Sequence, residues 1–301
     1  MAAEVLTALA PRPTGRYADG TLGGAGHAAS ILATSSPTGW LSGCDRDGIA
    51  VEAAKKRLAG QFAGRFELRR GNFSELADWI AAESCDGVLL DLGVSSPQLD
   101  TAERGFSFQQ DGPLDMRMDD RQSLTAADIV NRESAEALAN IFWEYGGERE
   151  SRRLAKAMVH DRALRKFETT RQLAELIERV SPRAGRKAHP ATKVFQALRL
   201  AVNDEIGSLK RGLDAAVKIL KPGGRLAVIT FHSLEDRVVK EFGRERTRDY
   251  TFLGTVDVPE LRTPRVPELR WVSRKALLPG EEELKSNPRA RSAQLRVLEK
   301  L

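Results

Sequence analysis

The segment RYADGTLGGAGHAASILATSSPTGWLSGCDRD (residues 16–47) decides the fold, because a short strand, a glycine-rich turn, a helix and a second strand follow one another in it. Gly23, Gly24 and Gly26 allow the backbone of the turn to approach a ligand closely. In a doubly wound sheet, this first strand-to-helix turn is where a nucleotide-like ligand binds. The glycines alone are equally compatible with a turn that has no ligand.

Asp45, at the end of the second strand, is a second candidate contact for a ligand. It follows the turn by about 20 residues, the position of the acid that accepts hydrogen bonds from ribose hydroxyls in dinucleotide-binding folds. Asp47 is expected to cap the next helix. Together these residues favour NAD or S-adenosylmethionine as the ligand and do not separate the two.

Strands continue to alternate with helices outside this segment. Further strands are expected at 65–72, 86–94, 225–231 and 293–299, and further helices at 48–60, 74–82, 210–220 and 233–242. This order predicts an α/β fold with a mainly parallel sheet. Residues 101–206 contain helical patterns and no good strand. We therefore expect a discontinuous core, 1–102 and 207–301, interrupted by an all-helical insertion, 103–206.

The charge of the chain is concentrated in this insertion. The net charge is +5, and the sequence pI is about 9.3. Residues 150–200 carry 13 Lys+Arg and 5 Asp+Glu, a net charge of +8. Such a region suits a phosphate-binding surface, and a solvated helical face is the alternative. Arg183, Arg186 and Lys187 are expected to contact phosphates.

The two cysteines indicate the cellular compartment in which the protein is expected. Cys44 and Cys85 lie among apolar or small residues without zinc-binding spacing, so we expect free thiols in a reducing cytosol and no metal site. The N-terminal residues lack the pattern of a signal peptide, and no run of about 18 apolar residues occurs. A cytoplasmic protein without a membrane span is expected.

Polar residues follow the third and fourth strands, whose carboxyl ends line the ligand crevice of such a sheet. Asn72 and Phe73 are expected near an adenine, and Asp91 is expected to point into the crevice. The alternative for Asp91 is a turn cap before Gly93.

His232 and Ser233 follow the strand at 225–231 and should lie at the same edge. Ser233 with Asp236 also matches a helix-capping pattern, so capping and active-site roles are both open. For His232, a structural role and an active-site role are both open.

A long helix is expected from His189 onward, with one apolar stripe and a polar stripe beside it. The polar stripe either contacts RNA or pins the insertion to the core; its residues are Thr192, Gln196, Arg199 and Asn203. Three arginines near the C-terminus suit phosphate or base contacts, with exposure without a specific role as the alternative: Arg289, Arg291 and Arg296.

Four long blocks carry a resemblance to a known family. They are DLGVSSPQLDTAERGFSFQQDGPLDMRMD (91–119), HPATKVFQALRLAVNDE (189–205), PGGRLAVITFHSLEDRVVK (222–240) and NPRARSAQLRV (287–297). In these blocks the chain resembles the bacterial 16S ribosomal RNA cytosine-N4 methyltransferases, from about Glu4 to the C-terminus. Members of that family usually begin with a short His-containing segment ahead of this point, which we expect near the cofactor.

The resemblance implies a class I (Rossmann-like) S-adenosylmethionine methyltransferase sheet with an inserted all-helical domain that recognises RNA. It implies N4-methylation of a cytidine in the decoding region, with 16S rRNA or the small ribosomal subunit as partner. It assigns cofactor contacts to Ala25, Gly26, His27, Asp45, Phe73, Asp91 and Gln98. Catalytic roles are expected for Asp91, His232 and Ser233. Substrate contacts are expected for Thr192, Gln196, Arg199, Asn203, Arg289 and Arg291.

Some residues depart from the family pattern. Ala25 stands where Gly is common, Lys193 stands where Arg is usual, and GGERESRR (146–153) replaces a more usual GEERFARR. No aromatic directly follows Asp91, so a ring that stacks on the target base is expected from Phe106, Phe108 or Phe231.

Other functions are still compatible with the sequence. A methyltransferase acting on DNA or protein is one alternative, and an RNA-binding assembly factor without catalysis is another. An NAD-dependent oxidoreductase is a third, although no acid–base pair suited to it is evident. The oligomeric state is not set by the sequence, and a homodimer is one alternative.

Overall fold

A computed structural model describes residues 1–182, 189–252 and 256–301 of the chain. Within it the chain divides into two compact units. The α/β unit comprises Met1–Gly93 and Ile206–Leu301, and the helical unit comprises Val94–Glu205.

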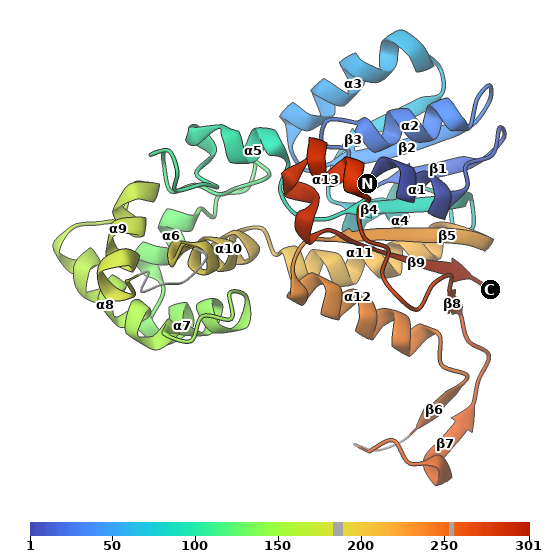
Figure 1. Cartoon of the computed structure of the whole chain (residues 1–301). Helices are drawn as coiled ribbons and strands as arrows, with labels where there is room; N and C mark the ends of the chain where they lie inside the picture. The colour runs from blue at the N-terminus through green and yellow to red at the C-terminus, as the bar shows by residue number, and fades with distance from the viewer. Residues whose placement is uncertain (183–188, 253–255) are drawn as a thin grey trace. The chain divides into compact units, whose positions relative to one another are not determined.

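The α/β unit contains a seven-stranded sheet in the order β3-β2-β1-β4-β5-β9-β8 (Figure 1). Its strands are β1 (Arg16–Asp19), β2 (Trp40–Asp45), β3 (Phe66–Arg70), β4 (Cys85–Asp91), β5 (Leu220–Thr230), β8 (Leu269–Trp271) and β9 (Gln294–Lys300). β1 to β5 are parallel, whereas β9 runs antiparallel to both of its neighbours. The strand order reverses between β1 and β4, which is where such sheets bind ligands. The predicted α/β methyltransferase sheet is confirmed.

Helices cover both faces of this sheet because side chains in the strands alternate between them. In β4, Val88 and Leu90 join one hydrophobic core, while Leu89 joins the other. The helices on the Leu89 face are α1 (Ala2–Leu9), α2 (Gly26–Thr34) and α3 (Gly48–Phe62). Those on the opposite face are α4 (Leu76–Trp79), α11 (Glu205–Ile219) and α12 (Ser233–Arg246). As predicted, Asp47 caps α3 by accepting a hydrogen bond from the Ile49 amide.

The chain between α12 and β9 is more ordered than the sequence indicated. The sequence predicts no strand or helix between 243 and 292, but the structure has a hairpin of β6 (Tyr250–Phe252) and β7 (Arg262–Pro264), with the short helix η3 (Pro259–Leu261) between the two strands. The short helices α13 (Glu281–Ser286) and η4 (Pro288–Ser292) follow the hairpin, and α1 was not anticipated either. The strand expected at 225–231 starts earlier, at Leu220, and its pairing with β4 shifts register near its start.

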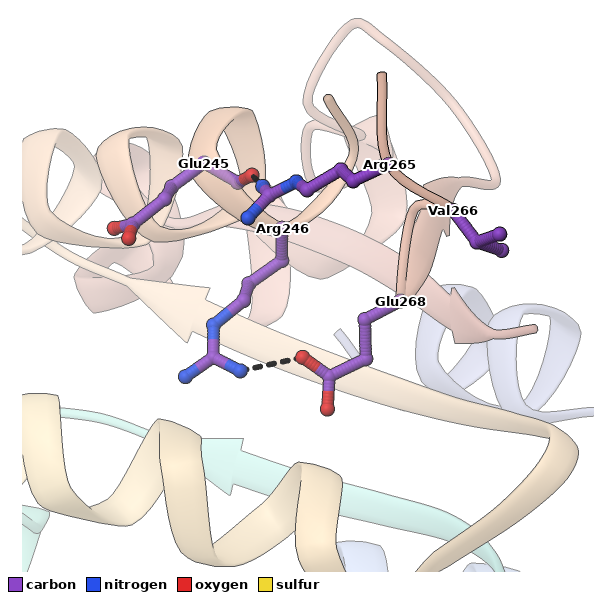
Figure 2. Close-up of a pocket in the computed structure, with 5 residues that line it drawn as sticks. All are labelled: Glu245, Arg246, Arg265, Val266 and Glu268. Atoms are coloured by element: carbon purple, nitrogen blue, oxygen red, sulfur yellow. Dashed lines mark hydrogen bonds and ion pairs between the residues drawn. The ribbon is translucent and has the colours of Figure 1, made fainter. Parts of the chain in front are cut away.

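A pocket of about 400 Å³ lies at the base of the hairpin (Figure 2). The Arg265 guanidinium donates to the carbonyls of Glu245 and Arg248, and Arg246 pairs with Glu268. The remaining lining residue is Val266. These contacts fasten the hairpin to the end of α12, and the pocket contains none of the predicted site residues.

The helical unit has a core of its own. Its helices are α5 (Ser96–Asp100), η2 (Ala102–Arg104), α6 (Ala126–Arg132), α7 (Ala135–Glu144), α8 (Ser151–Leu164), α9 (Thr170–Val180) and α10 (Ala191–Val202). Side-chain caps start three of them: Thr125, Ser134 and Thr169. Among its described residues the unit contains no strand, only an isolated bridge between Pro113 and Thr169.

Both boundaries of the helical unit differ from the sequence interpretation. The unit begins at Val94 rather than at 103, because Val94 and Leu99 pack against its core. The long helix expected from His189 stops at Val202, where Asp204 adopts a left-handed φ of 44°. In the described part of the chain, no helix combines the length and apolar character needed to cross a membrane.

Candidate functional site

Three carboxylates end three neighbouring strands of the α/β unit: Asp19 ends β1, Asp45 ends β2 and Asp91 ends β4. Asp19 pairs in register with Gly43 and with Leu89, so each of the other two aspartates lies two residues further along its strand. Because these strands are parallel, the three side chains gather at one edge of the sheet. We call these residues, with His27, the carboxylate edge.

Asp19 is the most deeply buried member of the carboxylate edge, with 1% of its surface exposed. Its Oδ1 accepts a hydrogen bond from the Thr21 amide at 3.0 Å. Its Oδ2 is buried and has no hydrogen-bond partner among the described residues. Burial raises the pKa of Asp19 to about 6, although the Thr21 amide and His27 oppose the shift. Sequence reasoning missed Asp19; the available signal was an acid that ends a strand directly before a glycine-rich turn.

Asp91 and His27 face each other across the carboxylate edge. Asp91 Oδ2 lies 3.5 Å from His27 Nε2, and the Asp91 amide donates to Thr21 Oγ1 at 2.6 Å. Asp91 Oδ1 is buried and unpaired within the described residues, so the alternative of a turn cap finds no support. Burial lowers the pKa of His27, but Asp91 and Asp19 together raise it above its ordinary value. The imidazolium is thus favoured by two carboxylates.

The glycine-rich turn folds back onto Asp45. The Gly23 amide donates to Asp45 Oδ2 at 2.9 Å, and burial raises the pKa of Asp45 while its backbone hydrogen bonds oppose the shift. Ala25 adopts a left-handed φ of 55°, a conformation that costs roughly 1–2 kcal/mol with a Cβ and explains why Gly is common there. A Cβ built on Gly24 or Gly26 would meet no atom within 4 Å, so the turn borders open space. A ligand can therefore approach this backbone closely.

Three residues predicted near the cofactor use their side chains for packing or capping. The Phe73 ring is buried against α11, where a Cβ on Gly212 would lie 2.2 Å from it. This packing does not support contact between the ring and an adenine. Asn72 caps the helix η1 (Phe73–Glu75). Gln98, in the helical unit, is buried and accepts a hydrogen bond from the Ser95 amide at 3.0 Å, which starts α5.

His232 and Ser233 follow β5, whose Ile229 pairs in register with Asp91. The predicted cap formed by Ser233 and Asp236 is wrong: His232 is the cap, with Glu235 as its reciprocal partner. His232 Nε2 also lies 3.1 Å from Glu235 Oε1, while Ser233 is exposed at the first position of α12. Catalytic roles for His232 and Ser233 stay predictions.

Asp236 instead forms a buried ion pair with Arg296, at 2.5 Å. Burial and this pairing are incompatible with the expected phosphate contact of Arg296, because its guanidinium is already used inside the α/β unit. Arg289 and Arg291, in η4, are exposed. Contact of these two arginines with RNA remains a prediction.

The residues of the polar stripe on α10 differ in their surroundings: two are available for substrate contact, and two are held by other residues of the helical unit. Thr192 is exposed and Gln196 is half-buried, so both stay candidates for substrate contact. Arg199 forms a bidentate ion pair with Glu205, at 2.8 and 3.1 Å. Asn203 is buried; its carbonyl accepts from the Met118 amide, and its NH2 donates to the Met116 carbonyl. Arg199 and Asn203 thus pin the helical unit internally, a correction to their expected contact with RNA.

The three aromatic candidates also differ. Phe106 is buried in the helical core, and Phe108 stacks on His189 with ring centroids 4.4 Å apart. Phe231, at the end of β5, is half-buried, and a Cβ on Gly93 would lie 3.5 Å from its ring.

Arg183, Arg186 and Lys187, which were expected to contact phosphates, lie outside the described residues. Cys44 and Cys85 are buried free thiols, as predicted.

Comparison with known proteins gives one consistent result. The family model described as the MraW methylase family matches residues 1–301. The chain is 51% identical to the ribosomal RNA small subunit methyltransferase H of Geobacter sulfurreducens, over 100% of this chain and 97% of the relative. It is 48% identical to the protein of the same name from Symbiobacterium thermophilum, over 99% of this chain and 94% of the relative.

Proposed function

The chain belongs to the MraW methylase family, and from this premise we propose that it transfers a methyl group from S-adenosylmethionine to 16S ribosomal RNA, at N4 of a cytidine in the decoding region. The observation that carries the proposal is the carboxylate edge. Asp19 Oδ2 and Asp91 Oδ1 are buried there without partners among the described residues, at the switch point of the sheet. Buried polar atoms left unpaired in the protein alone are suited to a bound polar ligand.

The residues present fit S-adenosylmethionine. The ligand carries an ammonium group and a sulfonium, and the carboxylates of Asp19 and Asp91 match those positive charges. Asp45 would hold the ribose, since each of its oxygens has a second lone pair beyond its backbone hydrogen bond. The open space beside Gly24 and Gly26 admits the ligand against the backbone. When bound, S-adenosylmethionine supplies an electrophilic methyl group.

Side chains of the protein would orient the target amine and stabilise the charge that develops on it. The N4 amine of cytosine is a weak nucleophile because its lone pair is delocalised into the ring. Asp91 Oδ1 would accept a hydrogen bond from this amine and stabilise the positive charge that develops as the nitrogen is alkylated. His27 lies beside the other oxygen, and Thr21 Oγ1 accepts from the Asp91 amide, so the carboxylate is held in one orientation. Positioning of this kind supplies much of an enzyme's rate gain.

The target base must leave its stack to reach this edge. Phe231 is the aromatic candidate within the α/β unit that would stack on the extruded base. We assign recognition of the RNA mainly to the helical unit, because the basic stretch 150–200 lies almost wholly within it. The relatives named for the small-subunit RNA support this substrate class, and we expect the proposed reaction to take place in the cytoplasm.

A methyl-transfer assay tests the proposal. Purified protein is incubated with donor labelled in the methyl group and, separately, with 16S rRNA, small ribosomal subunits, DNA or cellular protein. We expect label in RNA or subunits and none in DNA or protein. Label in DNA or protein alone would contradict the substrate class. RNA binding without any transfer would favour the alternative of an assembly factor that has lost catalysis.

A further inference from the structure

Trp143 is unusual among the aromatic residues of the helical unit. It lies in the last turn of α7, and 60% of its surface is exposed, whereas Leu138, Ala139 and Phe142 of the same helix are buried. An exposed indole gains nothing from the core of its own unit. Large exposed aromatic rings are typical of binding surfaces.

The backbone around Trp143 is tightly built. The Gly147 amide donates to the Trp143 carbonyl at 3.0 Å, and the Gly147 carbonyl accepts from Lys193 Nζ, also at 3.0 Å. A Cβ on Gly146 would lie 2.6 Å from the Lys193 carbonyl, so only glycine permits this approach. The end of α7, the following turn and the start of α10 are therefore in direct contact. Lys193 places its ammonium group at the same turn as Trp143.

Further cations accompany this turn. Arg149 follows it directly, and Arg152 and Lys156 lie four residues apart on α8, on one side of that helix. All three are exposed, and the described residues show no acidic partner for any of them. Other arginines of the unit are neutralised, such as Arg153 by Glu150.

The acids beside the turn do not cancel these charges. Glu148 is buried and accepts a hydrogen bond from the Glu150 amide, while Glu144 is the exposed acid adjacent to Trp143 in sequence. An exposed indole at a turn that also carries the Lys193 ammonium group and Arg149, with Arg152 in the first turn of the following helix, suits a polyanion that also carries aromatic faces.

We propose that Trp143 stacks on an unpaired base of the RNA substrate, with Arg149, Arg152 and Lys193 binding the adjoining phosphates. This inference rests on the proposed function. Stacking on an aromatic ring within a positively charged surface is how proteins bind single-stranded nucleic acid with little sequence preference. The net charge of +8 in residues 150–200 complements the phosphates and argues against a second copy of this chain as the occupant.

The test measures binding of a 16S rRNA fragment spanning the decoding region to the full chain. Trp143→Ala should weaken binding by roughly 5- to 150-fold, and Trp143→Phe should retain most of the affinity. Leu164→Ala is the matched control, because Leu164 is 81% exposed on α8 of the same unit, and we expect it to bind as the wild type does. Thermal melting of all three variants should match the wild type, since the side chains are exposed.

Salt dependence separates stacking from charge. Trp143→Ala should leave the slope of log affinity against log salt unchanged. The Arg149→Ala, Arg152→Ala double variant should reduce that slope by roughly 1 to 2. Calorimetry should show wild-type affinity for S-adenosylmethionine in each variant.

Two results would overturn the inference. One is wild-type RNA affinity in Trp143→Ala. The other is a change of mass in sedimentation with unchanged RNA affinity, which would assign Trp143 to contact between two copies of the chain. Either result, obtained with wild-type protein that methylates rRNA, leaves the proposed function standing; absence of methyl transfer by the wild type would contradict the proposed function itself.

Discussion

The carboxylate edge and the helical unit treat polar groups in opposite ways. At the carboxylate edge, Asp19, Asp91 and His27 each have a buried polar atom without a partner among the described residues. In the helical unit, by contrast, Asn203 is buried and hydrogen-bonded to the backbone, and Arg199 is half-buried and paired with Glu205. Charged side chains for which the described residues show no ion-pair partner, such as Arg149, are exposed to solvent. Under the proposed function, we expect the first region to bind one small ligand and the second to bind a large, hydrated polyanion.

The energetic cost falls in different places in these two regions. Burying an acid without a partner destabilises the fold, and the raised pKa of Asp19 is the sign of that cost. Exposed cations cost the fold little and contribute only when phosphates replace their counterions. Substitutions at the edge should therefore change chemistry, ligand affinity and pH dependence. Substitutions within the helical unit should change either its stability or RNA affinity.

The largest effect is expected at Asp91. Asp91→Asn keeps the shape of the side chain and one carbonyl acceptor but removes the negative charge that would stabilise the alkylated amine. The single-turnover rate of methyl transfer, at saturating donor and RNA, should fall by about 10²–10³. A wild-type rate would show that Asp91 has a structural role and that its charge does not contribute to methyl transfer at the carboxylate edge.

A second expected effect concerns the pH dependence of stability. The pKa of Asp19 is raised from 3.8 to about 6 in the folded protein, so between these values the folded state holds the proton more tightly than the unfolded state does. The free energy of unfolding should therefore fall by about 2 kcal/mol as pH rises from 4 to 6 through this group alone.

Asp19→Asn keeps the hydrogen bond from the Thr21 amide and removes this titration. Urea unfolding of both proteins across this pH range measures the difference, which should favour the variant increasingly as pH rises. Because Asp19 also raises the pKa of His27, the variant loses part of that upward shift, and the difference between the two curves belongs to Asp19 together with His27. Parallel stability curves would contradict the assignment of a strained, desolvated acid at this edge.

A somewhat smaller effect is expected for cofactor binding. Asp45→Ala removes the proposed acceptor for the ribose together with the hydrogen bond to the Gly23 amide. Affinity for S-adenosylmethionine should fall by roughly 10- to 150-fold in calorimetry, while RNA affinity stays within twofold or so of the wild type. Equal loss of both affinities would indicate that the two regions are not functionally separate.

The smallest expected effect concerns the stability of the helical unit. Asn203→Ala leaves the buried Met116 carbonyl and Met118 amide without their partner, and should lower the free energy of unfolding by about 1–3 kcal/mol. Gln196→Ala, on the same helix but half-buried, is the control and should change stability by less than about 0.5 kcal/mol. RNA affinity of folded Asn203→Ala should be unchanged; a specific loss would restore the RNA-contact interpretation of the stripe.

Much of this architecture was predictable from the sequence because periodicity and capping are local properties. The buried strand β4, the cap at Asp47 and the strand that ends at Asp45 all follow from short patterns. What escaped prediction depends on distant partners. Nothing local in the α10 stripe distinguishes Asn203, which meets Met116 and Met118, from Gln196.

The same limit applies to charge. Arg296 and Arg289 look alike in the sequence, but only Arg296 is buried against Asp236, a partner 60 residues away. Asp19 carried a local signal, the glycine-rich turn that follows it, but its burial also depends on the neighbouring strands β2 and β4. Asp19, Asp91 and His27, which we propose carry function at the carboxylate edge, each have a buried polar atom without a partner among the described residues, a property that only a three-dimensional arrangement reveals.

The most direct test of the central claim is mass mapping of the methylated nucleotide. 16S rRNA or small subunits that lack the modification are treated with the purified protein and S-adenosylmethionine, digested to nucleosides and oligonucleotides, and analysed by mass spectrometry. The account predicts one added methyl group, on N4 of a single cytidine in the decoding region. A methyl group on another atom of the base, on another nucleotide or outside the ribosomal RNA would contradict it.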